Sequence, residues 1–403
     1  MAVTGSITTR FIDEKGLDLG KTLIEKDYLI SVYPNLLNQF DTPMLMTWGT
    51  NQYGGLGDNT ATSKSSPVQT IAWGANWKQV SGSLFHISAI KTDGTLWSWG
   101  YGGYGNLGDN TIVGKSSPIQ TIAFGTNWKQ VYSGRQNTAA IKTDGTLWVW
   151  GQNSQGQLGD NTATVHKSSP VQTVAFGTNW KQVSCGFSYT ACIKTDGTLW
   201  SFGRNDYGQL GDNTITNRSS PVQTVAFGSN WKQVACGYYA SAAIKTDGTL
   251  WTWGYNYNGS IGDNTATAHK SSPVQTIAFG TNWKQVSVGR SITACTKTDG
   301  TLWLWGDQFS YGQLGDNTTT KKSSPVQTIA GGTNWKQVSC GLYNTFAIKT
   351  DGTLWCWGSN DGGQLGDNTT TNRSSPVQTI LYGNNWKQIS SFNFAAAIKD
   401  GDF

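Results

Sequence analysis

The sequence predicts an all-β fold, a seven-bladed β-propeller closed by N- and C-terminal strands in one blade, with a non-repeat N-terminal arm. Three features of the 403 residues predict it: a repeat of fixed period, four short apolar segments in each repeat, and partial repeats at the two ends that complete each other. Each repeat contains a tryptophan-rich segment that ends in a glycine. These glycines are 51 or 52 residues apart, at Gly49, Gly100, Gly151, Gly203, Gly254, Gly306 and Gly358. We therefore expect one propeller domain over residues 43–403, preceded by an arm of residues 1–42 that anchors or docks it.

A β-hairpin forms the centre of each unit. Residues 91–100 have the sequence KTDGTLWSWG, and close copies begin at Lys142, Lys194, Lys245, Lys297 and Lys349. An Asp-Gly pair between apolar, alternating segments is typical of a type I′ turn, because both central residues of that turn need positive φ. The hairpin therefore supplies the second and third strands of every unit.

The four predicted strands are clearest in one unit, where they begin at Trp180, Tyr189, Thr198 and Pro221. Each segment is short, contains β-branched and aromatic residues, and is bounded by Gly, Asn, Asp or Ser. Four such strands in each of seven units indicate a propeller.

Tryptophan is expected to form the core between blades. The pair Trp97 and Trp99 recurs from unit to unit, and residues two apart on a strand project from the same sheet face. Burying one indole removes roughly 150–250 Å² from water, which contributes on the order of 4–6 kcal/mol at ~25 cal/mol per Å². A second column begins at Trp77 and adds another layer.

The two ends of the chain predict how the ring closes. The first unit starts at Pro43 directly in its third strand, and the last unit ends after its second strand. Because a tight Asp-Gly hairpin joins neighbouring strands of one blade, the last two strands should pair with the first two. Residues 398–401 should therefore meet the backbone near residues 43–46.

The net charge of +5 arises from the repeat. Each unit carries three recurring basic residues and two recurring aspartates, which gives +7, and the remaining residues give −2. We expect these charges to be solvated turn residues around the rim. A nucleic-acid surface would need basic residues gathered on one face, so nucleic acid is not an expected partner.

Cysteine usage and hydropathy limit where the protein is expected to be located. Cys185, Cys236 and Cys340 occupy the same place in different units, so they are expected to be small buried residues rather than disulfide partners. The sequence has no signal peptide and no apolar run of 18 residues, so a membrane span is not expected. A virion or cytoplasmic location fits these features.

No motif favours catalysis, a cofactor or a metal. Each unit contains Leu-Gly-Asp-Asn-Thr or a near copy, as at Asp58, but lacks the further oxygen ligands and closing Glu of a calcium loop. Asp and Asn commonly bond their own backbone in turns, and we favour that role. The three histidines form no nucleophile-base pattern. The sequence therefore predicts no enzyme.

Binding residues are expected on one face of the disc. Loops alternate between the two faces of an antiparallel blade, and those on one face vary from unit to unit while the hairpin loops stay constant. Tyrosine and arginine among Gly, Asn and Ser are typical of binding surfaces. The long loops also contain Tyr53, Tyr101, Tyr104 and Arg204. The predicted partner-binding residues are Phe85, His86, Arg135, Tyr189, Tyr207, Tyr238, Tyr239, Tyr255, Tyr257, Arg290, Phe309, Tyr311 and Tyr343.

The segment W-G-x-N-x-x-G-Q-L-G-D resembles the repeat of the regulator of chromosome condensation family. It occurs at residues 357–367, and at residues 202–212 with Phe in the first position. The resemblance covers about residues 43–403 and implies a seven-bladed propeller with mixed-end closure. Members that act as nucleotide exchange factors use an inserted wedge and a basic tail, and this chain has neither, so exchange activity is a minor alternative.

The near-identical units and separate arm also resemble propellers encoded by tailed phages. This resemblance implies a non-enzymatic, virion-associated adhesion or decoration protein, in which residues 1–42 bind an assembly partner and the variable loops bind a protein or a cell-surface glycan. The alternatives are a cellular protein-binding or inhibitory propeller, and a carbohydrate-binding lectin that uses exposed tyrosines.

Overall fold

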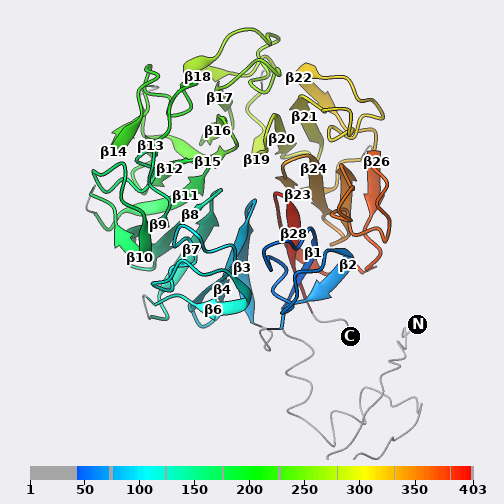
Figure 1. Cartoon of the computed structure of the whole chain (residues 1–403). Coiled ribbons are helices and arrows are strands. Elements are labelled where there is room, and N and C mark those ends of the chain that lie inside the picture. Colours follow the sequence, from blue (N-terminus) through cyan, green and yellow to red (C-terminus); the bar gives the residue numbers. More distant parts are fainter. Residues whose placement is uncertain are drawn as a thin grey trace, which may run out of the picture.

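Seven four-stranded antiparallel sheets form a closed ring in the computed structural model (Figure 1). The structure describes residues 43–400 apart from residues 72–75, 123–124, 175–176, 226–227, 279, 331 and 382. The predicted arm, residues 1–42, lies outside the described residues. All regular elements in the described ranges are strands.

Each blade contributes one strand to each of four concentric positions. The inner strands are β3 (Trp77–Gly82), β7 (Trp128–Ser133), β11 (Trp180–Cys185), β15 (Trp231–Cys236), β19 (Trp283–Val288), β23 (Trp335–Cys340) and β27 (Trp386–Ser391). The second strands are β4 (His86–Lys91), β8 (Asn137–Lys142), β12 (Tyr189–Lys194), β16 (Ala240–Lys245), β20 (Ile292–Lys297), β24 (Asn344–Lys349) and β28 (Phe394–Lys399). The third strands are β1 (Met44–Gly49), β5 (Leu96–Gly100), β9 (Leu147–Gly151), β13 (Leu199–Gly203), β17 (Leu250–Gly254), β21 (Leu302–Gly306) and β25 (Leu354–Gly358). The outer strands are β2 (Lys64–Gln69), β6 (Lys115–Gln120), β10 (Lys167–Gln172), β14 (Arg218–Gln223), β18 (Lys270–Gln275), β22 (Lys322–Gln327) and β26 (Arg373–Gln378).

The predicted closure is confirmed. One sheet has the order β2-β1-β28-β27, so both ends of the described chain share a blade. Met44 pairs with Lys399 and Leu45 with Ile398, in the register that the sequence predicts. The outer strand differs from the prediction, since β14 begins at Arg218 rather than at Pro221. An irregularity in the pairing with β13 lets Arg218 lie opposite Gly203 and extends the strand backwards.

The core lies between neighbouring blades. Trp99 is fully buried, and its ring lies 6.1 Å from that of Trp77. The indole Nε1 of Trp99 donates a 2.9 Å hydrogen bond to the Gly55 carbonyl of the preceding unit. Gly57 has a φ of 67°, and a Cβ on it would lie 2.7 Å from that same Nε1, so only glycine fits beneath the indole. The Leu-Gly-Asp-Asn-Thr motif is thus partly a packing site for the next blade.

Polar side chains also join the blades. Gln79 accepts a 3.0 Å bond from the Val131 amide and donates one of the same length to its carbonyl, which links β3 to β7. Gln388 makes the same pair of bonds to Val80 and closes the circle. On the outside of the ring, Asn59 takes a φ of 60°, and its amide donates to the Ser116 carbonyl of the next blade at 2.9 Å. These recurring residues of the repeat therefore hold neighbouring blades together.

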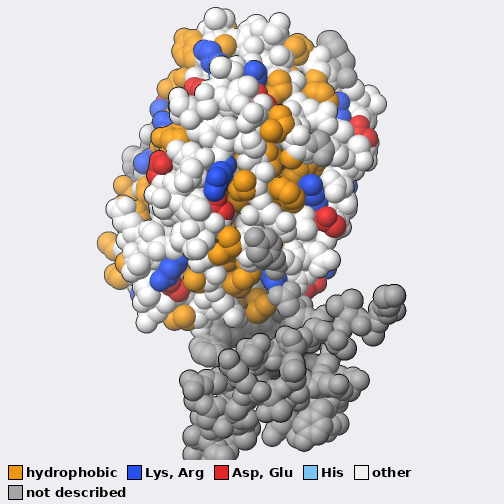
Figure 2. Space-filling view, turned by 90° about the vertical axis from the view of Figure 1, so that its right-hand side faces the viewer, with side chains coloured by type: hydrophobic (Ala, Val, Ile, Leu, Met, Phe, Trp, Pro, Cys, Tyr) orange, Lys and Arg blue, Asp and Glu red, His pale blue; other side chains and the backbone are white. Residues whose placement is uncertain are grey.

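The outer rim is electrostatically paired. Each outer strand begins with Lys or Arg, which lies 2.8–3.9 Å from the aspartate of its own Asp-Asn-Thr loop. Figure 2 shows one side of the ring, on which basic and acidic side chains lie next to each other rather than in separate patches. This part of the predicted solvated charge is therefore neutralised locally.

Candidate functional site

Two kinds of loop meet on one face of the disc, which we call the loop face. The short connection after each inner strand and the long loop after each third strand lie side by side, as shown by the 2.9 Å bond from the Tyr101 amide to the Phe85 carbonyl. The opposite face, which carries the Asp-Gly turns, is called the hairpin face. Both kinds of loop on the loop face vary from unit to unit outside the recurring Leu-Gly-Asp-Asn-Thr motif.

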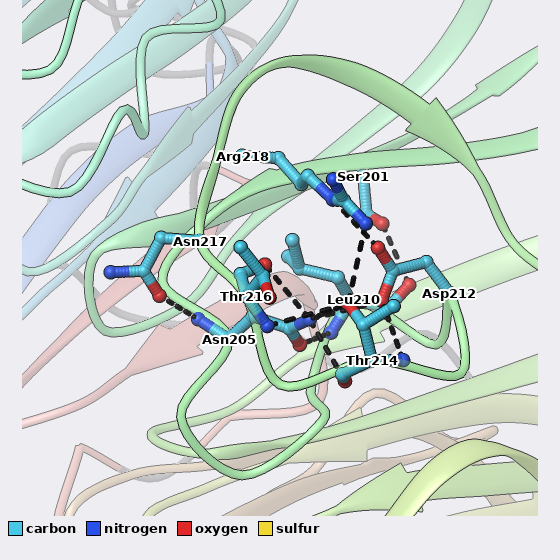
Figure 3. Close-up of polar contacts among 8 residues, drawn as sticks. All are labelled: Ser201, Asn205, Leu210, Asp212, Thr214, Thr216, Asn217 and Arg218. Carbon is cyan, nitrogen blue, oxygen red and sulfur yellow. Dashed lines mark hydrogen bonds and ion pairs between the residues drawn. The ribbon is translucent and has the colours of Figure 1, made fainter.

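A buried asparagine holds five of the seven long loops in shape, and Gln308 makes the equivalent bonds in a sixth. Asn205 is fully buried, and its side-chain amide donates to Asp212 and to the Thr214 carbonyl, each at 3.0 Å (Figure 3). Its Oδ1 accepts the Leu210 amide at 2.9 Å. Burial disfavours ionisation of Asp212, but hydrogen bonds from Thr214 and Arg218 outweigh that effect and hold its pKa below the ordinary value. The carboxylate is therefore a structural acceptor that fixes the loop.

Three arginines lie among aromatic rings on the loop face. The Cζ of Arg135 lies 4.0 Å from the ring centroid of Phe187 and 5.6 Å from that of Phe85. The Cζ of Arg290 lies 5.0 Å from Tyr343 and 5.2 Å from Phe309. Such stacking attracts the guanidinium to the ring face and limits its rotamers. The contacts of Arg135 with Phe85 and Phe187 and of Arg290 with Tyr343 cross blade boundaries, whereas Phe309 belongs to the same blade as Arg290.

The third arginine belongs to a cluster of tyrosines. Arg204 lies 5.1 Å from the Tyr239 ring and forms a 2.6 Å ion pair with Asp206. Tyr239 in turn lies 4.9 Å from Tyr207, and Tyr207 lies 5.1 Å from Tyr255. Aromatic side chains of several blades thus form a continuous network.

A histidine completes this cluster. His269 stacks on Tyr255 at 4.9 Å and lies 4.4 Å from Tyr257. Its Nδ1 accepts a 3.1 Å bond from the Asn256 amide, so this nitrogen carries no proton, and burial lowers the pKa of the ring. The position of His269 among the tyrosines could not be predicted from the sequence.

Eleven of the predicted binding residues lie in these loops, and we call them, together with Phe187 and Arg204, the aromatic–arginine band. Phe187 and Arg204 were outside the predicted set, although both belong to the variable loops. The eleven are Phe85, Arg135, Tyr207, Tyr238, Tyr239, Tyr255, Tyr257, Arg290, Phe309, Tyr311 and Tyr343.

Two predicted residues are misplaced. His86 and Tyr189 are the first residues of β4 and β12, and both are fully buried between blades. His86 bonds Thr138 of the next blade at 2.8 Å, and the Tyr189 hydroxyl donates to the Ala240 carbonyl at 2.8 Å. The first residue of a second strand points into the interface between blades, so these two side chains cannot contact a partner.

The central channel beneath the band is interrupted. A cavity of about 40 Å³ at the loop face is lined by Tyr132, Arg135 and Phe187 among others, and one of about 140 Å³ lies towards the hairpin face. Tyr132 borders both cavities, while the other six inner strands have Ser or Ala at this position. The centre of the ring therefore holds two separate cavities, and Tyr132 is the largest of the side chains that line both.

The thiols near the channel are unreactive. Cys185, Cys236 and Cys340 are buried and unbridged, as predicted. Burial raises the pKa of Cys236 and of Cys340 to about 12, so neither is a thiolate at neutral pH. In the described ranges no group of three His, Cys, Asp or Glu residues could hold a metal ion, and no helix could cross a membrane.

The fold and the loop face define a seven-bladed propeller of the kind that presents a binding surface on a rigid ring. The chain belongs to the RCC1-like domain family, whose model matches residues 40–264 and again residues 178–401. It is 31% identical over 340 residues to the ultraviolet-B receptor UVR8 of Arabidopsis thaliana, covering 83% of this chain and 77% of that protein. It is 26% identical over 337 residues to the human E3 ubiquitin-protein ligase HERC2, covering 80% of this chain but only 7% of that protein.

Solved structures share the fold. Prp20p from Saccharomyces cerevisiae, described with its binding to Gsp1p and histones, superposes with a TM-score of 0.81 at 16% identity, over 90% of this chain and 92% of that one. Human WBSCR16 superposes with a TM-score of 0.79 at 18% identity, over 90% of this chain and 100% of that one. At these identities the likeness establishes the architecture alone.

Proposed function

We propose that this protein is a non-enzymatic binding propeller that docks a protein partner on the aromatic–arginine band. The observation that carries the proposal is that two arginines are stacked between aromatic rings of the blades on either side and have no carboxylate partner in the described part of the chain. Arg135 lies between Phe85 and Phe187, and Arg290 lies between Tyr238 and Tyr343. Arg204, in contrast, is paired with Asp206. Family membership supports a binding role, because the related yeast propeller is described by its protein ligands.

The band suits tight recognition for energetic reasons. Its rings are half-buried in mutual contacts, so little side-chain entropy remains to be lost when a partner binds. Tyrosine and arginine also contribute most strongly when they anchor the centre of an interface. The Arg135 side chain is only partly buried, so an acidic group at the mouth of the channel could pair with its guanidinium.

The partner should therefore present acidic side chains flanked by apolar groups. A carboxylate would bind Arg135 or Arg290, and the neighbouring apolar groups would cover Phe187, Tyr238 and Tyr343. Electrostatic pairing of this kind fixes the orientation of the complex, while the aromatic contacts supply most of the affinity.

A site-specific crosslinking experiment tests the proposal. A photoreactive amino acid at Tyr343 should capture a partner in extracts of the source, and the same group at Thr246, exposed on the hairpin face, should not. Changing Arg135 and Arg290 together to Ala should abolish capture, with the unfolding midpoint unchanged within error. Equal capture from Thr246, or capture that survives the double change, would contradict the assignment of the face.

Two narrower functions are distinguished by further measurements. A lectin is favoured by the exposure of Tyr257, which is 53% accessible, and would lose glycan binding when Tyr255 and Tyr257 become Ala. Display on a phage particle, with residues 1–42 as the attachment, predicts that the full chain is found in purified particles and that a chain starting at Asp41 is not. If the full chain is absent from purified particles, the hypothesis of display on a phage particle is wrong, while the protein-binding proposal is unaffected.

A further inference from the structure

A groove lies towards the rim of the loop face, between the blade that contains β1 and the blade that contains β5. Its volume is about 590 Å³, within the range of ~300–1,000 Å³ that is usual for small-molecule sites. One wall is the long loop between β1 and β2, with Gln52 and Tyr53, and the other consists of Tyr101 and residues 114–116 at the start of β6. We call it the Tyr53 groove. Neither Tyr53 nor Tyr101 belongs to the aromatic–arginine band.

The groove presents an exposed ring whose position is fixed. Tyr53 is 41% accessible to solvent. Its ring makes edge-to-face contacts with Phe85 at 5.5 Å and with Tyr101 at 5.3 Å, and its hydroxyl accepts a 3.1 Å hydrogen bond from Gln52 Nε2. A ring that is exposed but already held in place loses little conformational entropy when a ligand packs against it.

Polar atoms beside this ring keep hydrogen-bonding capacity. The Ser116 hydroxyl donates to Asn59 Oδ1 at 3.3 Å, whereas the Asn59 Nδ2 donor has no partner within the described ranges. The Oε1 acceptor of Gln52 has none there either, and both side chains are exposed. A free donor and a free acceptor next to an aromatic ring suit hydroxyl groups, because a hydroxyl both donates and accepts.

The groove carries no unbalanced charge. Lys115 is the one charged side chain among the described residues that line it, and its Nζ lies 3.7 Å from the carboxylate of Asp109. The arginines of the band, Arg135 and Arg290, are by contrast stacked on rings without a carboxylate. Electrostatics therefore favour an uncharged ligand in the Tyr53 groove.

Two glycines that are particular to the second unit shape the groove. A Cβ on Gly103 would overlap the hydroxyl of Tyr101, so a side chain at position 103 would displace that ring. Gly114 stands directly before β6, where the other six units have Ser, His, Asn or Lys. In five of those units this side chain bonds the backbone of the long loop, whereas Gly114 leaves the wall of the groove bare. The framework of the repeat does not require either glycine.

We propose that the Tyr53 groove binds a neutral saccharide. The C–H groups on one face of a pyranose ring form an apolar surface that packs on an aromatic ring, here Tyr53. The hydroxyls of the sugar then bond Gln52 and Asn59, which supply the acceptor and the donor. The site is separate from Tyr255 and Tyr257, which the lectin function considered above would use, and it does not depend on the protein-docking function.

Other ligands fit the groove less well. An extended peptide that added to the edge of β6 would need the Ser116 carbonyl, but that carbonyl accepts a 2.9 Å bond from the Asn59 amide. A wholly apolar ligand would cover the polar atoms of Gln52 and Asn59 without bonding them, which is costly. An acidic ligand would find the one cation of the groove, Lys115, already paired.

A glycan array followed by saturation-transfer NMR tests the proposal with the full-length protein. The array carries neutral glycans of hexoses, deoxyhexoses, pentoses and N-acetylhexosamines in both anomeric linkages, together with glycans that contain uronic or sialic acids. The neutral glycan with the strongest signal is then titrated against the wild type and against Tyr53→Ala, Tyr53→Phe and Tyr257→Ala. Tyr257→Ala is the matched control, because Tyr257 is also an exposed tyrosine of a long loop.

The wild type should bind neutral glycans in preference to acidic ones. Tyr53→Ala should weaken binding at least about tenfold, because the stacking surface is lost. Tyr53→Phe keeps the ring, so it should stay within about threefold of the wild type, as should Tyr257→Ala. Magnetisation should pass from the protein mainly to the C–H protons on one face of a single sugar ring.

Four results would overturn the proposal: no binding to any neutral glycan, tighter binding to acidic glycans, unchanged affinity in Tyr53→Ala, or a loss confined to Tyr257→Ala. Tighter binding of a proline-rich peptide to the same groove would also contradict it. Arg135 and Arg290 are unchanged in all of these proteins, so capture of a protein partner by the band is measured independently and stands or falls by its own experiment.

Discussion

Acidification should destabilise the propeller through one buried imidazole. His86 is fully buried, with Nδ1 3.0 Å from the Ser83 hydroxyl and Nε2 2.8 Å from the Thr138 hydroxyl. Thr138 already donates its own proton to the Asn106 carbonyl, so it accepts from Nε2–H. The Ser83 hydroxyl lies within hydrogen-bond distance of both Nδ1 and the His86 carbonyl, so these two acceptors share its one proton. The ring is therefore neutral, and burial lowers its pKa from 6.5 to about 3.

The sign and size of the effect follow from proton linkage. Below pH 6.5 the unfolded chain binds a proton at His86, whereas the folded chain does not until the pH approaches 3. The free energy of unfolding therefore decreases by about 1.4 kcal/mol for each pH unit below 6.5. The loss reaches about 3 kcal/mol at pH 4.5 and is complete near pH 3.

The repeat supplies a natural control residue. Asn137 and Asn344 occupy the place of His86 in two other blades, so His86→Asn should fit without protonating. Urea unfolding of both proteins, followed by tryptophan fluorescence at pH values from 7 to about 4.5, gives their difference in free energy. All other titrating groups are shared, so their contributions cancel. The wild type should lose about 3 kcal/mol more than the variant over this range.

Parallel pH dependence of the two proteins would refute this reasoning. It would mean that His86 takes up a proton in the folded state at an ordinary pKa, which requires water or an acceptor at both ring nitrogens.

Three further changes probe the framework and the channel. Trp99→Phe removes the hydrogen bond to Gly55, and urea unfolding should show a loss of about 1–2 kcal/mol; an unchanged midpoint would mean that the bond adds nothing. Gln388→Leu leaves the amide and carbonyl of Val80 without their side-chain partner and should lower the unfolding free energy by about 2 kcal/mol, whereas a neutral result would exclude a role in ring closure. Tyr132→Ser should join the two cavities in a crystal structure of the variant; a channel that stays divided would show that other side chains close it.

The fold could be predicted because its determinants are local and repeated. The Asp-Gly pair correctly predicted a hairpin within about ten residues, although the turn is not type I′: φ is positive at Gly94 but not at Asp93. Six such hairpins and a repeat of nearly constant spacing leave few arrangements other than a ring. Ring closure could be predicted because the last unit ends after its second strand. Residues 44–49, at the other end of the described chain, supply the missing third strand. The start of each outer strand was missed, since the irregular pairing opposite Gly203 depends on the partner strand and leaves no local signal.

The binding residues were predicted less completely, for a reason of geometry. Variation between units identified the correct loops, but not the direction of each side chain. His86 follows the variable turn directly, yet its side chain enters the space between blades and bonds Thr138 of the next unit. Likewise, Phe187 contacts Arg135 across a blade boundary, 52 residues along the chain, and nothing in either unit alone signals that contact.

The two faces follow different rules because the framework separates them. Residues that hold the ring together, such as Gln79 and Trp99, recur in the repeat and are bonded to the neighbouring blade. The exposed lysine that follows the first residue of each inner strand, such as Lys78, lies one residue from those bonds and recurs with them. Band residues such as Tyr238 instead project from loops whose shape is set by other, buried side chains. The loop face can therefore be altered residue by residue to suit one partner, while the residues of the hairpin face stay the same from blade to blade.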